Sequence, residues 1–150
     1  MAIDVTIEVA IARSPDVVFE RIADVAAWPA WLIASGIVSV TRTADGPLGG
    51  GERLTVEQRA AGRVGTFDAV VLEINHPSRL VVAGRDKDGV SIEIEVALAT
   101  ADVGTALRWS MRIGLPFRYR IFESMARPEV ERAAALDIEA LRRSLEAPQG

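Results

Sequence analysis

The amino-acid sequence predicts an α+β protein in which a seven-stranded antiparallel sheet wraps around a long C-terminal helix, with two short helices after the first strand. Three observations lead to this prediction. Apolar and polar residues alternate along several stretches, as in strands that bury one face. Short turn-rich pieces separate these stretches, which is typical of antiparallel neighbours. The chain then ends in a helical spacing of apolar residues.

The first strand and the two short helices occupy the N-terminal part of the chain. Residues 3–11 alternate at period two, which predicts a strand. Ser14 can cap a helix that starts directly after it and runs to about Val25. Pro29 cannot continue that helix because proline lacks an amide donor. We therefore expect a second short helix at Trp31–Ile33.

The middle of the chain reads as strands separated by turns, and its last part reads as a helix. We expect six further strands, at residues 37–43, 51–60, 64–75, 79–85, 90–99 and 105–113. After Pro116 the pattern becomes helical, most clearly from Pro128 to Glu146, where apolar residues recur on one side. No linker or repeat interrupts this order, so we expect a single domain over residues 1–150.

The predicted elements leave space between sheet and helix. Seven strands about 4.8 Å apart make a sheet roughly 30 Å wide, whereas one helix with its side chains is about 10–12 Å across. Only 5% of the residues are aromatic, so large side chains that could fill the difference are few. We therefore expect an enclosed cavity lined by alternate strand residues, the usual form of a small-molecule pocket.

The composition excludes several classes of partner and chemistry. Seventeen basic and 21 acidic residues give a formal charge of -4, and the two signs are interspersed, which argues against nucleic acid as a partner. The absence of cysteine excludes disulfides, thiolate nucleophiles and cysteine-ligated metals, and agrees with a reducing compartment. Neither a signal-peptide pattern nor a membrane-length apolar run is visible. We expect a cytoplasmic protein without integral membrane association.

Candidate cavity residues come from inward strand faces, from the corner between the short helices, and from the segment before and within the long helix. They are Trp31, Val56, Gln58, Ile94, Trp109, Met111, Tyr119, Phe122, Met125 and Asp137. Two of the three tryptophans, Trp28 and Trp31, flank Pro29. Their indoles either brace the corner or offer a flat apolar surface to a ligand.

Among the polar candidates, Asp137 falls near the middle of the apolar face of the last helix. It is either a buried polar anchor or general acid/base in the cavity, or, if the helix is rotated, a solvated carboxylate. Asp137, Tyr119 and Asp68 show no pairing that would identify catalytic residues, which stay unknown. His76 lies in an Asn-His-Pro turn and is expected to be a solvated loop residue. We therefore expect no metal site and no cofactor.

The sequence contains one glycine-rich stretch, and four segments of the chain, taken in order, carry a family resemblance. Gly49–Gly51 lacks the lysine and hydroxyl of a phosphate loop and reads as a bend at a strand entry. The segments that carry the resemblance are Ser14–Phe19 running to Trp28–Trp31, the hairpin Gly46–Gly51, the strand-turn-strand Val71–Leu80 and the ending Leu141–Glu146. In this order and spacing the chain resembles the START/SRPBCC helix-grip superfamily, in its polyketide cyclase/dehydrase-like branch.

The resemblance implies a seven-stranded sheet that grips a C-terminal helix, with two short helices closing one end of a hydrophobic cavity. Our leading hypothesis is binding or transport of a small hydrophobic ligand, such as a lipid, a polyketide or an aromatic metabolite. The alternative is a cyclase or dehydratase that acts in the same cavity. A second alternative is a protein-interaction module of the Hsp90-activator type. We expect a monomer or a homodimer.

Overall fold

The computed structural model describes residues 2–60 and 62–148 as one run of strands and helices. In chain order these are β1 (Ala2–Ile11), α1 (Pro15–Ala23), the 3-10 helix η1 (Val25–Ala30), β2 (Ile37–Arg42), β3 (Arg53–Ala60), β4 (Arg63–Asn75), β5 (Arg79–Arg85), β6 (Ser91–Ala101), β7 (Gly104–Gly114), the 3-10 helix η2 (Phe117–Phe122) and α2 (Glu123–Glu146). The seven predicted strands are all present, each within two residues of its predicted bounds.

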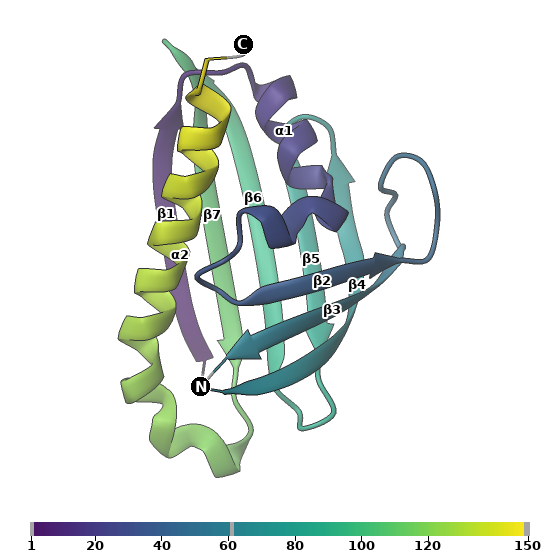
Figure 1. Cartoon of the computed structure of the whole chain (residues 1–150), viewed down its shortest axis with the longest axis vertical. Helices are drawn as coiled ribbons and strands as arrows, with labels where there is room; N and C mark the ends of the chain where they lie inside the picture. Colours follow the sequence, from purple (N-terminus) through teal and green to yellow (C-terminus); the bar gives the residue numbers. More distant parts are fainter. Residues whose placement is uncertain (1, 61, 149–150) are drawn as a thin grey trace.

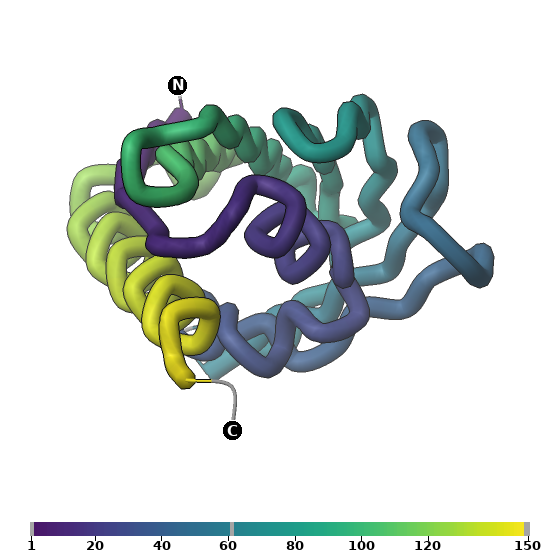
Figure 2. Tube along the Cα trace, turned by 90° about the horizontal axis from the view of Figure 1, so that it is seen from above, coloured from purple at the N-terminus to yellow at the C-terminus, as the bar shows by residue number. Residues whose placement is uncertain are grey.

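The strands form one antiparallel sheet in the order β1-β7-β6-β5-β4-β3-β2. This sheet curves strongly, and α2 lies along its β1 edge while η1 lies on β2 near the other edge (Figure 1). Seen from above, the two edges approach each other around a common interior, with α2 and the N-terminal helices completing the ring (Figure 2). The predicted α+β helix-grip architecture is confirmed.

The N-terminal helices differ from the prediction in where the chain bends. Helix α1 ends at Ala23, and Asp24 leaves helical geometry with φ -78° and ψ 73°. Pro29 lies inside η1, one residue before its end. The predicted helix at Trp31–Ile33 is therefore wrong, because the short helix precedes this segment. A proline in the last turn of a short 3-10 helix is tolerated, since its ring fixes φ at a value that this helix uses.

The C-terminal helix is longer than its clearest sequence pattern. Helix α2 starts at Glu123 and follows η2 directly, so Pro128 lies inside the helix instead of at its start. Within the described residues no helix has the length and the apolar character that crossing a membrane requires.

Three tryptophans fill the interior on the side of α1 and η1. Trp109 of β7 is 1% exposed and meets Trp28 and Trp31 edge-on, at ring-centroid distances of 6.4 and 5.5 Å. The indole N–H of Trp28 donates to the carbonyl oxygen of Ile22 over 2.8 Å. Edge-to-face contacts of this kind stabilise a core beyond the area that they bury. Trp28 and Trp31 therefore brace the corner between the short helices and the sheet.

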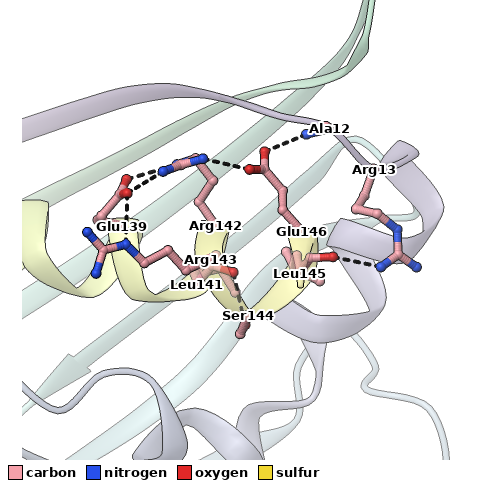
Figure 3. A network of polar contacts seen from close by, with 9 residues as sticks. All are labelled: Ala12, Arg13, Glu139, Leu141, Arg142, Arg143, Ser144, Leu145 and Glu146. Carbon is pink, nitrogen blue, oxygen red and sulfur yellow. Dashed lines mark hydrogen bonds and ion pairs between the residues drawn. The ribbon is translucent and has the colours of Figure 1, made fainter. Parts of the chain in front are cut away.

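The C-terminal end of α2 is bound to the loop that follows β1. The Glu146 carboxylate accepts from the backbone N–H of Ala12 over 2.8 Å, and the Arg13 guanidinium donates to the carbonyl oxygen of Leu145 over 2.7 Å (Figure 3). The second of these contacts satisfies a carbonyl that the helix end leaves without an intrahelical donor. Together they fix the last turn of α2 against the end of β1.

Arg142 extends this attachment along the exposed side of α2. Its guanidinium bridges Glu139 and Glu146, and Arg143 donates to Glu139 as well (Figure 3). The hydrogen bond from Arg142 keeps the pKa of Glu139 below its usual value. Arg142, Glu139 and Glu146 are still partly accessible to solvent, which weakens ion pairs, so we assign these contacts mainly the role of orienting Glu146 toward Ala12.

Gly36 allows the loop after η1 to close on β3. It has φ +77°, a conformation that favours glycine. A Cβ atom at this position would lie 2.0 Å from the carbonyl oxygen of Arg59. The Arg59 N–H donates to the Gly36 carbonyl oxygen over 2.7 Å, so the two backbones are in direct contact. Only a residue without a side chain fits here.

We expect Gly36→Ala to lower the free energy of unfolding by at least about 1 kcal/mol, the low end of the strain for a side chain in the left-handed region. Urea denaturation followed by circular dichroism measures this change. Gly50→Ala is the matched control, because a Cβ there meets no atom within 4 Å. Equal stability of the two variants would contradict the close contact between Gly36 and Arg59.

Candidate functional site

A groove of about 440 Å³ lies between the sheet and the N-terminal half of α2. Its sheet side is lined by Phe67, Val90, Ile92, Met111 and Ile113, and its helix side by Val130, Ala133 and Leu136. The loop residues Ala34 and Ser35 close one end. The predicted cavity thus exists as an open groove over part of the sheet, not as an enclosed void under the whole helix.

The floor of the groove follows from the strand alternation. Ile92 of β6 pairs with Ile113 of β7, and Ile94 pairs with Met111, so these residues share the inner face in two neighbouring rows. Phe67 reaches the same face from β4. The intervening residues Glu93 and Arg112 pair with each other on the outer face and are exposed. The period-two pattern therefore supplies a continuous apolar wall.

The helix wall is formed by small or half-buried residues. Val130 and Ala133 are only partly buried, and Leu136 is 57% exposed. The C-terminal half of α2 differs, because its inward residues are fully buried, Ile138 and Leu141 among them. The methyl side chain of Ala133 leaves space where the later turns fill the interior with larger side chains.

The groove continues into a second cleft of about 660 Å³ at the edge of the β3–β4 and β5–β6 hairpins. The two share Gln58, Ala60, Phe67 and Val90 as lining residues. Tyr119 of η2 borders this mouth, as do Arg63 and Asp88, which form an ion pair over 3.2 Å. An apolar interior thus opens through a polar rim, the arrangement expected of a small-molecule site.

Asp137 is buried, with 2% of its surface exposed. Its two carboxylate oxygens accept from the backbone N–H groups of Ala34 and Ser35, each over 2.8 Å. Asp137 therefore lies on the buried face of α2, and the rotated, solvated alternative is wrong. Charge-assisted hydrogen bonds to two backbone donors compensate the burial of the carboxylate. Asp137 acts as a polar anchor that ties the loop after η1 to α2.

Gln58 belongs to the same hydrogen-bonded group and also lines the groove. Its side-chain amide donates to the carbonyl oxygen of Ser35 over 2.8 Å. Asp137 and Gln58 therefore hold Ser35 from opposite sides, one through its N–H and the other through its carbonyl group. Gln58 lines both the groove and the second cleft. Its fixed position makes it a candidate for orienting a ligand.

The remaining predicted cavity residues fall into two groups. Trp31, Val56 and Trp109 belong to the buried core, and Ile94 packs against that core. Phe122 and Met125 are 51% and 73% exposed and lie outside the groove lining, which differs from the expectation. The reason is that η2 and the first turn of α2 extend beyond the sheet instead of folding over it (Figure 1).

Sequence reasoning missed several residues that line the groove, including Phe67, Ile92, Ile113 and Ala133. Ile92 and Ile113 carried a usable signal, because they alternate in the same strands as Ile94 and Met111. Ala133 carried none, since nothing local distinguishes an alanine beside a groove from one in a filled core.

Two of the ionisable residues that line the groove, Glu129 and Arg132, pair with each other. Arg132 donates to Glu129 within α2. Asp68 is exposed at the mouth, and His76 lies on another surface beside Asp16, with a nitrogen-to-oxygen distance of 3.8 Å. In residues 2–60 and 62–148, acidic and histidine side chains form no cluster that could hold a metal ion.

Comparison with solved structures shows the same fold over nearly the whole chain. The aromatase/cyclase Zhui from Streptomyces sp. R1128 has a TM-score of 0.77 at 18% identity, covering 97% of this chain and 94% of its own. A START superfamily protein from Mycobacterium smegmatis has a TM-score of 0.71 at 15% identity, covering 97% of both chains. Ara h 8.0201 has a TM-score of 0.67 at 15% identity, covering 97% and 98%.

Sequence comparison identifies the family. No curated protein matches the chain significantly. The family model described as polyketide cyclase / dehydrase and lipid transport matches residues 2–146. Because this match covers nearly the whole chain, the chain belongs to the polyketide cyclase / dehydrase and lipid transport family.

Proposed function

We propose that this protein binds a small hydrophobic ligand in the groove between α2 and the sheet. The observation that carries the proposal is an apolar space of about 440 Å³ beside an otherwise filled core. Pockets for small molecules range from about 300 to 1,000 Å³ and combine apolar walls with a few fixed polar groups. Gln58 is such a group. Each methylene that a ligand buries here contributes about 0.8 kcal/mol.

The alternative to ligand binding is catalysis of a cyclisation, because one protein of similar structure, Zhui, is described as an aromatase/cyclase. Such chemistry needs an acid or base within hydrogen-bond reach of the substrate. Both carboxylate oxygens of Asp137 are occupied by the backbone of Ala34 and Ser35, and Glu129 pairs with Arg132 at the rim. These contacts favour binding over catalysis. The fold by itself does not determine which of the two functions the protein has.

We expect Ala133→Trp to weaken binding of the neutral fluorescent probe N-phenylnaphthylamine at least about tenfold, equal to about 1.4 kcal/mol. The indole would occupy the space that the Ala133 methyl leaves open. Fluorescence titration measures the dissociation constant. Ala140→Trp is the matched control, because Ala140 is exposed on the same helix and lies outside the groove lining.

A dissociation constant that both variants leave unchanged would contradict the groove as the binding site. Native mass spectrometry of protein from its own host gives the second measurement, since a bound hydrophobic ligand adds a discrete mass. That added mass should be absent from Ala133→Trp and retained in Ala140→Trp.

We expect Asp137→Ala to lower the free energy of unfolding by about 2–3 kcal/mol, because two backbone donors lose a charged acceptor. Glu131→Ala, an exposed change on the same helix, should have little effect. Urea denaturation measures both. If Asp137→Ala folds with unchanged stability and abolishes turnover of a candidate substrate, Asp137 is catalytic and the binding proposal is wrong.

A further inference from the structure

Large apolar side chains gather on the surface where η2 joins α2. Phe117, Ile121 and Met125 are 84%, 76% and 73% exposed, and Phe122 is 51% exposed. Of the ten large apolar residues exposed in the described part of the chain, these four lie within one short stretch. Single exposed apolar residues are ordinary, whereas a contiguous group marks an interaction surface.

Basic residues are interleaved with these apolar ones. Residues 117–127, here called the docking segment, contain Arg118, Arg120 and Arg127 against one acid, Glu123, a formal charge of 3 - 1 = +2. The rest of the chain then carries -4 - 2 = -6. Glu123 is 8% exposed, so the accessible charge of the docking segment is positive. A basic and apolar surface on an acidic protein selects an anionic partner.

The local contacts leave the cations available at the surface. The Arg120 guanidinium lies 5.5 Å from the centroid of the Phe117 ring, and both side chains are exposed. Arg118 lies 4.8 Å from the Tyr119 ring and donates to the carbonyl oxygen of Asp88 over 2.6 Å, which attaches the docking segment to the β5–β6 turn. The carbonyl acceptor itself carries no charge, although the nearby carboxylates of Asp88 and Asp86 attract the Arg118 guanidinium and offset part of its charge.

The docking segment forms one end of the molecule. It extends below the ends of the strands at the bottom of Figure 1, beside the β5–β6 turn. Tyr119 in its middle borders the mouth of the groove. The surface therefore lies beside the opening through which a ligand would enter.

We propose that the docking segment binds the surface of an anionic lipid bilayer. Phe117, Ile121 and Met125 enter the boundary between headgroups and acyl chains, while Arg118 and Arg120 lie at the level of the lipid phosphates. Short amphipathic segments with basic residues bind membrane surfaces in this way, with apolar burial and charge attraction acting together. This inference stands on the surface alone and does not depend on the ligand of the groove.

A second copy of the chain fits this surface less well. A two-fold dimer places the same patch of both protomers in one interface, so the cations Arg118 and Arg120 of the two copies would be brought near each other. A standard protein interface also uses about 20–30 residues on each side. The docking segment offers four exposed apolar side chains, which suits shallow insertion into lipid.

The test is sedimentation of the full chain with vesicles. We expect binding to vesicles that contain phosphatidylglycerol, weaker binding to pure phosphatidylcholine, and release at high salt. The double variant Phe117→Ser/Ile121→Ser should lower the partition constant at least about tenfold, since burial of each side chain contributes about that factor. Arg120→Gln should lower it about fivefold on anionic vesicles only.

Two controls make the result specific. Val103→Ser removes an equally exposed apolar side chain, 79% exposed in the β6–β7 turn, and should bind vesicles like the unmodified protein. Arg53→Gln removes an exposed cation on β3 and should leave the partition constant unchanged. Circular dichroism confirms that each variant is folded, as expected for substitutions at exposed positions.

Three outcomes would overturn the proposal. They are no binding to anionic vesicles, equal loss of binding in Val103→Ser, and a dimer in sedimentation velocity that the double variant dissociates. The last would show that a second copy covers the docking segment. Vesicle binding without any binding of the naphthylamine probe would instead refute the groove proposal and leave the docking proposal intact.

Discussion

One helix about 10–12 Å across cannot cover seven strands spaced about 4.8 Å apart, and this protein meets that constraint differently along the length of α2. On the side of α1 and η1, the side chains of Trp28, Trp31 and Trp109 fill the interior of the curved sheet. Beside the N-terminal half of α2 no comparable side chains are supplied, and the groove remains. The location of the three indoles therefore decides which part of the concave face stays open.

Polar contacts hold this unequal arrangement in place. Arg13 and Glu146 attach the last turn of α2 to the end of β1, and Asp137 binds the loop between η1 and β2. These contacts lie on the filled side or at the boundary of the groove. Buried ionic groups of this kind add specificity to the position of a helix only when every acceptor is satisfied. Because backbone donors saturate Asp137, the carboxylate has a structural role in positioning Ala34 and Ser35.

Local patterns were sufficient for the sheet, because period-two alternation and turn residues are properties of neighbouring positions. They also gave the phase of Asp137 relative to Ala134 and Leu141, but they left open whether this carboxylate is buried or solvated, which the contacts with Ala34 and Ser35 decide. The division between filled core and groove was not predictable in this way. Trp109 and Ile113 share one face of β7, yet only Trp109 meets indoles from a segment about eighty residues away. Pro29 led to a wrong second helix because it lies inside the short helix η1 and does not separate two helices.

The groove and the docking segment lie at the same end of the molecule, and this proximity has a physical consequence. An apolar molecule that leaves a bilayer for a protein in solution must cross water, and the cost grows with each exposed methylene. With the docking segment on a lipid surface, Tyr119 and the groove mouth stand beside that surface, so the exposed path shortens. The same geometry gives this acidic protein a single favoured orientation on an anionic membrane. The docking segment is positively charged and attracted to the membrane, whereas the rest of the chain is negatively charged and repelled by it. A filled core at one end and an open groove at the other are thus compatible with exchange of ligand at a membrane surface.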